Sequence, residues 1–220
     1  MFPRFKKVQI AKCIAIGGMI GMGKSTLATA LAEELNGQAI LELHKKDKIT
    51  ELLLEKLYER ESDKYASVFQ LYFALTRSES YSKNANRKKI TIFDRTIFED
   101  YLFAIRNIKT PSVIRYYISL WDSEIKKLIY QNGLPAVYII LKGSNELMYD
   151  RIKSRGRKCE IDNLEKNKQY LEELNNHYVD YLVRICKNYN IEYLVVEADI
   201  PTKEQVSYIV KELYERKISY

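Results

Sequence analysis

Gly18-Met19-Ile20-Gly21-Met22-Gly23-Lys24-Ser25 fits the pattern G-x-x-x-x-G-K-[ST], in which a glycine-rich loop joins a strand to a helix. The apolar run 13–16 comes directly before this segment, and the helix-forming residues 26–35 follow it. Glycines let backbone N–H groups approach phosphate oxygens, and the N-terminus of the following helix favours negative charge. We therefore expect residues 18–26 to bind the phosphates of a nucleoside triphosphate such as ATP.

Three side chains at the end of this segment have the chemistry that such a site needs. Lys24 can reach the outer phosphates, Ser25 can ligate Mg²⁺, and Thr26 begins the helix whose N-terminus faces the anion. The alternative is a glycine-rich turn that binds no ligand. The strand before the loop and the helix after it favour the phosphate site.

Short apolar runs alternate with longer amphipathic stretches along the chain. The runs are residues 13–16, 39–41, 90–93, 136–141 and 191–196. This alternation is typical of a parallel sheet whose strands are joined by crossover helices. We expect an α/β fold with a five-stranded parallel sheet flanked by helices, in one domain over residues 1–220.

Composition excludes several other classes. Among the 220 residues, 46% are hydrophobic and 30% charged, and the net charge of +7 is spread along the chain rather than gathered in a block. Nucleic acid is therefore not expected as a partner. No uncharged stretch reaches the ~18 apolar residues of a membrane helix. Cys13, Cys159 and Cys186 fit neither a disulfide framework nor a zinc site, which favours a reducing, cytoplasmic setting.

Polar residues follow the second and third apolar runs, at the edge where parallel sheets bind ligands. Glu42 could take a proton from an attacking hydroxyl there, although a solvated charge at a strand end is the alternative. Asp94 could hold Mg²⁺ and Arg95 could steady a transferring phosphoryl group. A helix cap with a surface arginine is the alternative for this pair.

A second basic segment follows the fourth run. Arg151 and Arg155 share one helical face, Gly156 can end that helix, and Arg157 comes next. With a phosphate loop in the same chain, we expect residues 143–160 to form a lid that neutralises charge on a triphosphate. Solvated surface is the alternative for a basic run of this kind.

Taken together, these motifs resemble the deoxynucleoside kinase family, particularly its short bacterial purine-directed members. The resemblance covers nearly the whole chain and rests on the order and spacing of its segments. The matching segments are Gly18–Thr26, Leu41-Glu42, Leu57-Tyr58-Glu59, Phe69-Gln70, Thr76-Arg77-Ser78, Asp94–Asp100 and Arg151–Glu160. It implies a P-loop kinase fold and transfer of the γ-phosphoryl group of ATP, with Mg²⁺, to the 5′-hydroxyl of a deoxynucleoside in nucleotide salvage.

The resemblance also implies roles for individual residues. Glu42 would be the general base, Arg95 would assist it, and Asp94 would lie near Mg²⁺. Tyr58 and Glu160 would hold the sugar 3′-hydroxyl, and Gln70 would bind the base. Arg151, Arg155 and Arg157 would be lid arginines. Arg77 and Asp100 match a charged pair that accompanies acceptance of purines and cytosine. Deoxyadenosine or deoxyguanosine is thus the expected acceptor, with deoxycytidine next.

The chain departs from the family pattern at two places. Residues 42–47 lack the proline and tryptophan of many members, and Cys159 replaces one of two acidic residues in the lid.

The rival functions are a thymidylate-type nucleoside monophosphate kinase and a non-catalytic triphosphate-binding protein. The resemblance further implies a homodimer formed through helices, which the aromatic stripe around Tyr117 and Trp121 permits, although burial is the first expectation for such a stripe.

Overall fold

The computed structural model describes residues 9–42, 48–59, 63–86 and 88–218. Its centre is one parallel sheet in the order β2-β3-β1-β4-β5. The strands are β1 (Ile10–Gly18), β2 (Gln38–Ile40), β3 (Thr91–Asp94), β4 (Leu134–Lys142) and β5 (Glu192–Glu197). Each strand coincides with one of the five apolar runs, so the predicted five-stranded α/β architecture is confirmed.

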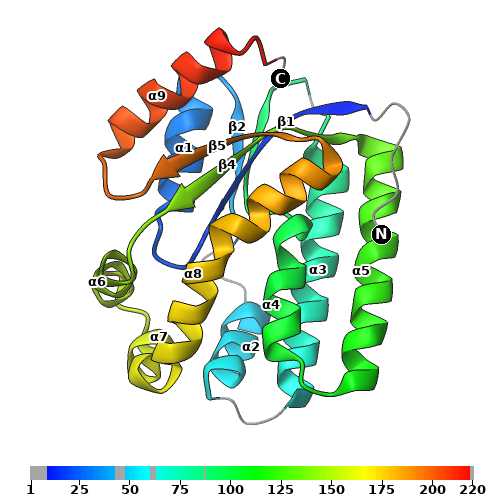
Figure 1. Ribbon diagram of the computed structural model, residues 1–220, viewed down its shortest axis with the longest axis vertical. Helices are drawn as coiled ribbons and strands as arrows, with labels where there is room; N and C mark the ends of the chain where they lie inside the picture. The colour runs from blue at the N-terminus through cyan, green and yellow to red at the C-terminus, as the bar shows by residue number, and fades with distance from the viewer. Residues whose placement is uncertain (1–8, 43–47, 60–62, 87, 219–220) are drawn as a thin grey trace.

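Helices connect the strands and cover the sheet (Figure 1). They are α1 (Lys24–Glu34), α2 (Lys48–Glu59), α3 (Asp63–Asn84), α4 (Asp100–Asn107), α5 (Pro111–Asn132), α6 (Asn145–Arg155), α7 (Lys158–Asp162), α8 (Leu164–Tyr189) and α9 (Thr202–Glu215). Helices α1 and α9 pack against each other, whereas α8 crosses the strands and contacts β1, β4 and β5. Helices α3, α4 and α5 pack together beside α8 (Figure 1).

The central strands are apolar because both faces of the sheet are covered. Residues 13–16 of β1 and 137–140 of β4 are fully buried, whereas β5, at the sheet edge, alternates between exposed and buried positions. Ile16 of β1 lies opposite Asp94 of β3 and Ile139 of β4. This register brings the glycine-rich loop after β1 next to the Asp94-Arg95 pair.

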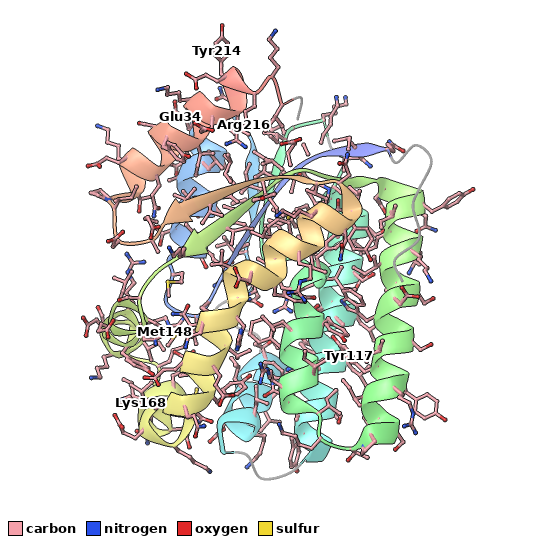
Figure 2. All side chains as sticks on the ribbon, in the orientation of Figure 1. Glu34, Tyr117, Met148, Lys168, Tyr214 and Arg216 are labelled. Carbon is pink, nitrogen blue, oxygen red and sulfur yellow. The ribbon has the colours of Figure 1, made fainter. Side chains whose placement is uncertain are left out.

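The aromatic stripe of α5 is part of the interior. Tyr117 and Trp121 are 2% and 3% exposed, and the Trp121 indole donates a hydrogen bond to the Ile97 carbonyl at 2.8 Å. Figure 2 shows Tyr117 between α5 and the neighbouring helices. Burial was the first expectation and is confirmed, so these two side chains cannot form a pairing surface. The large hydrophobic side chains that α5 exposes are Tyr116 and Tyr130 instead.

Within the described residues, no helix combines the length and the apolarity that a membrane crossing requires.

Candidate active site

The loop between β1 and α1 leaves backbone donors available for an anion. Gly21 and Gly23 have φ angles of 79° and 86°, in the left-handed region that favours glycine. A Cβ on Gly21 would lie 2.9 Å from the carbonyl oxygen of Met148, which Figure 2 labels on α6. Helix α1 begins at Lys24 without a side-chain cap on its first turn. Its N–H groups can therefore bind phosphate.

Lys24 and Ser25 lie at the end of this loop, against β3. The Lys24 ammonium donates a hydrogen bond to the Met19 carbonyl at 3.0 Å. Burial, and secondarily the nearby Arg95 guanidinium, lowers the pKa of Lys24 to about 8. The Ser25 hydroxyl donates to Oδ2 of Asp94, whose Oδ1 is buried and has no hydrogen-bond partner among the described residues. A free carboxylate oxygen next to a hydroxyl is a suitable pair of ligands for Mg²⁺.

Glu42 lies between two arginines. Its Oε2 is 3.1 Å from Nε of Arg95, and its Oε1 forms an ion pair with Arg77. Burial would raise the pKa of Glu42, but Arg77, Arg95 and Lys24 outweigh burial and lower it to about 2. The carboxylate is therefore ionised and fixed in orientation at the edge of the sheet.

A pocket of about 520 Å³ opens beside the loop. Its apolar walls include Leu54 and Leu57 of α2, Phe69 and Phe73 of α3, and Phe103 of α4. The predicted site residues that line it are Met19, Ile20, Lys24, Ser25, Glu42, Gln70, Arg77, Asp94, Arg95, Arg155, Arg157 and Glu160. The residues expected to bind phosphate, the candidate base and an apolar compartment thus share one cavity, which is large enough for a small-molecule ligand.

Two polar groups of α3 lie within the apolar part of the pocket. Gln70 is 1% exposed, and its amide nitrogen has no partner among the described residues. Arg77 forms an ion pair with the fully buried Asp100 and stacks on the Phe73 ring at 4.8 Å. A buried donor without a partner next to a fixed cation favours the binding of a polar group.

The three predicted lid arginines separate into two environments. Arg155 and Arg157 form ion pairs with Glu160 at 2.5 Å and 3.4 Å. Arg151 instead donates to the carbonyls of Gly21 at 3.3 Å and Ala198 at 2.6 Å. Gly156 ends α6 with a φ of 73°, as the sequence predicted. Arg151 therefore contacts the backbone of the phosphate loop, whereas Arg155 and Arg157 line the cavity.

Behind Arg95 lies a buried polar group that the sequence did not indicate. Glu99 is 0% exposed and accepts hydrogen bonds from Arg95 at 2.7 Å, from Tyr138 at 2.6 Å and from Tyr178. The only local signal was Thr96-x-x-Glu99, which fits a helix capping box. That motif predicts a cap and carries no information about the tyrosines, which come from β4 and α8.

Residues 14–218 match the sequence profile of the family described as "Deoxynucleoside kinase". The chain belongs to the deoxynucleoside kinase family. Because the match spans almost the whole chain, the predicted family and its P-loop kinase fold are confirmed, and so is a nucleotide-binding kinase as the class of enzyme.

Curated relatives of this deoxynucleoside kinase agree with that membership. The chain is 43% identical over 215 residues to an uncharacterised protein of Mycoplasma pneumoniae, which covers 97% of this chain and 92% of the relative. It is 30% identical over 202 residues to a deoxyadenosine kinase of Dictyostelium discoideum, with coverage of 92% and 79%.

A solved structure gives the same result. A deoxyadenosine kinase from M. mycoides, with the products dCMP and a flexible dCDP bound, has a TM-score of 0.75 at 26% identity, and the match covers 92% of this chain and 99% of that one. A structure of that enzyme with bound dATP has a TM-score of 0.73 at 28% identity, with the same coverage.

One predicted site residue and one departure from the family pattern lie outside the described part of the chain. The backbone of Tyr58 belongs to α2, but its side chain is outside the described residues, as are residues 43–47, where the family proline and tryptophan are missing. The pairing predicted for Tyr58 and Glu160 therefore stays a prediction. Glu160 itself is 2% exposed and lines the pocket of this kinase.

Proposed function

We propose that this deoxynucleoside kinase transfers the γ-phosphoryl group of ATP to the 5′-hydroxyl of a purine deoxynucleoside. The observation that carries the proposal is the position of Glu42. It lines the same cavity as Lys24 and Ser25 of the phosphate loop and contacts Arg95 at 3.1 Å. A carboxylate so placed lies at the boundary between the triphosphate and the apolar compartment, where an attacking hydroxyl would enter.

In the proposed reaction, Glu42 accepts the proton of the 5′-hydroxyl as this oxygen attacks the γ-phosphorus directly and in line. The bond from the γ-phosphorus to the β,γ-bridging oxygen breaks, and ADP leaves. The low pKa of Glu42 makes it a weak base. A phosphoryl transition state with largely dissociative character needs little base strength and much positioning, so a firmly held carboxylate is suitable. Arg95, Arg155 and Arg157 neutralise charge on the phosphate oxygens. No covalent intermediate with the enzyme is required.

Ser25 and Asp94 are the residues that would hold Mg²⁺. The unpaired Asp94 Oδ1 and the Ser25 hydroxyl supply two oxygens, and protein sites for Mg²⁺ commonly offer only one or two carboxylates besides substrate phosphates. When bound, the ion would offset negative charge on the β- and γ-phosphates.

The pocket residues support a purine acceptor. The Gln70 amide would form the hydrogen bonds to the base, and the Arg77–Asp100 pair would present fixed charge at its edge. Sites that bind a polar group specifically reject analogues that leave buried partners unpaired. Similarity to a deoxyadenosine kinase and to a deoxyadenosine/deoxycytidine kinase supports the same substrate class.

The rival reading is a thymidylate-type nucleoside monophosphate kinase. It would require cationic groups for a phosphate on the acceptor, next to where Glu42 stands. An ionised carboxylate at that point would repel such a phosphate. The cytoplasmic setting, the part in nucleotide salvage and the homodimer stay predictions.

The test is the initial rate of phosphorylation with ATP and Mg²⁺ across deoxyadenosine, deoxyguanosine, deoxycytidine, thymidine and their monophosphates. We expect the highest kcat/KM with a purine deoxynucleoside. A preference for thymidine would contradict the roles of Arg77 and Asp100. Activity confined to monophosphates would favour the rival kinase, and inactivity with every acceptor would favour a non-catalytic triphosphate-binding protein.

A further inference from the structure

The carboxylate of Glu99 is fully bonded by groups from three parts of the fold. Its Oε2 accepts from Arg95 at 2.7 Å and from the Tyr178 hydroxyl, and its Oε1 accepts from the Tyr138 hydroxyl at 2.6 Å and from the Thr96 amide at 3.4 Å. A carboxylate offers about four acceptor sites, so these donors satisfy it. This saturation fixes the orientation of a buried charge that would otherwise be costly.

The hydroxyl of Tyr178 is saturated in the same way. It donates to Glu99, and it accepts from the Gly18 amide at 3.0 Å and from Nη1 of Arg95 at 3.1 Å. A phenolic hydroxyl has one hydrogen to donate and two lone pairs to accept with. Gly18 is the first residue of the phosphate loop, and Arg95 contacts Glu42 at 3.1 Å. One hydroxyl thus connects the triphosphate side of the site to the candidate base.

Close packing restricts the movement of Glu99 and of the tyrosines bonded to it. A Cβ on Gly17 would lie 2.8 Å from Cε1 of Tyr138, 3.3 Å from Oε1 of Glu99 and 2.5 Å from Leu182. Strand β1 therefore packs closely against Tyr138 and Glu99. Tyr138 and Tyr178 are themselves 0% and 1% exposed.

Arg95 is fixed by its backbone and by contacts of its guanidinium. Its backbone has a φ of 71°, and its amide donates to the Ile16 carbonyl at 3.0 Å. Its guanidinium lies over the Phe103 ring at 5.0 Å, and its Nε faces Glu42 while its Nη1 faces Tyr178. A strained backbone that the surroundings over-determine is characteristic of a functional residue whose direction matters.

We propose that Tyr178 is a positioning residue that fixes the Arg95 guanidinium relative to the phosphate loop, so that Arg95 and Glu42 are both correctly placed for the reacting phosphate. The proposal rests on the proposed function. Tyr178 touches no substrate. It acts through the Gly18 amide on one side and the Arg95 guanidinium on the other. Loss of its hydroxyl would remove the hydrogen bonds that join the Arg95 guanidinium to the Gly18 amide, while the other contacts of Arg95 remain.

The test compares Tyr178→Phe with Tyr181→Phe. Tyr181 lies on the same helix, and its hydroxyl donates to the Phe98 carbonyl at 3.0 Å. Both variants thus lose one hydroxyl and its donated hydrogen bond to the 3₁₀ turn η1 (Ile97–Glu99), but only Tyr178 reaches Arg95 and the loop. We expect Tyr178→Phe to lower kcat on the order of tenfold to a hundredfold, the effect of a slight misplacement of reacting groups.

The split between kcat and KM distinguishes positioning from structure. KM for both substrates should stay within about threefold of wild type in Tyr178→Phe, because the groups that bind them remain. Tyr181→Phe should keep the wild-type kcat at a similar thermal midpoint. Equal kcat values for the two variants, measured below their midpoints, would overturn the proposal.

Glu99→Gln supplies a second measurement that does not depend on the folding of Tyr178→Phe. Its amide nitrogen would face donors that now bind a carboxylate oxygen, so the same drop in kcat is expected, and an unchanged kcat would overturn the proposal. Failure of the proposed function is separate, because it would appear as inactivity of the wild type towards every nucleoside.

Discussion

At the scale of single residues, the proposed function depends most on Glu42. Its carboxylate lines the pocket together with Lys24 and the apolar walls, and it is ionised because Arg77 and Arg95 flank it. Position and ionisation together make it the proposed base.

Glu42→Gln should lower kcat by at least about 100-fold, since general bases contribute on the order of 10²–10⁴ to rate. Triphosphate binding should persist, because Lys24 and the loop amides are unchanged. Steady-state rates and calorimetric titration with a non-hydrolysable ATP analogue measure the two effects. Glu33→Gln, an exposed change on α1, is the control. Retained turnover in Glu42→Gln would remove Glu42 from the mechanism.

Lys24 predicts how binding depends on pH. Its pKa of about 8 means that the free protein loses this charge as pH rises through 8. Kd for the ATP analogue should therefore rise by up to about tenfold per pH unit above that value. Lys24→Arg keeps its charge, so its Kd should stay flat over the same range. A flat profile for the wild type would contradict the lowered pKa.

The same shift has a consequence for stability. The unfolded chain keeps the Lys24 proton up to its ordinary pKa of 10.5, whereas the folded chain releases it near 8. Between these values the unfolded state binds more protons, so the contribution of Lys24 to the free energy of unfolding rises with pH.

At the scale of secondary-structure elements, the lid role of the segment that contains α6 and α7 stays a prediction. Gly156 ends α6, and the turn that it forms brings Glu160 of α7 within ion-pair distance of Arg155 and Arg157. Glu160 thus neutralises both arginines within their own segment.

Gly156→Ala should lower the free energy of unfolding by about 1 kcal/mol, because alanine is disfavoured at the φ of 73°. No heavy atom lies within 4 Å of the added Cβ, so the backbone alone accounts for the cost. Urea unfolding measures it, with the exposed Ser154→Ala on the same helix as control. An equal stability of the two variants would show that the left-handed turn does not persist in solution.

At the scale of the whole molecule, α8 connects the central sheet to the candidate active site. Its Leu182 is 0% exposed and lies against Gly17 of β1, four residues along the helix from Tyr178. Packing in the centre of the fold therefore keeps the buried hydrogen-bonded group behind Arg95 in place.

Leu182→Ala should cost about 2–5 kcal/mol of unfolding free energy, because it leaves a cavity in a close-packed interior. Arg184→Ala, an exposed change on the same helix, should stay within about 0.5 kcal/mol of wild type. Denaturant midpoints at constant m-value compare the two. A loss below 1 kcal/mol, on the scale of surface changes, would mean that α8 packs less tightly on β1 than described.

The sequence by itself determined the features that depend on neighbouring residues. The glycine-rich loop, the five strands, the end of α6 at Gly156 and the clustering of Glu42 with Asp94 and Arg95 could all be predicted, because each follows from local chemistry or from the rule that parallel strands end at one edge. Family membership was predicted from the order of the same segments.

Tertiary structure alone decided what distant residues do together. Gly18 and Tyr178 are separated by 160 positions and meet at one hydroxyl, and Glu99 gathers partners from β4 and α8. The contact of Arg151 with the loop backbone also required the packed helices. No local pattern encodes such contacts, because burial and hydrogen-bond partners arise only when the elements pack.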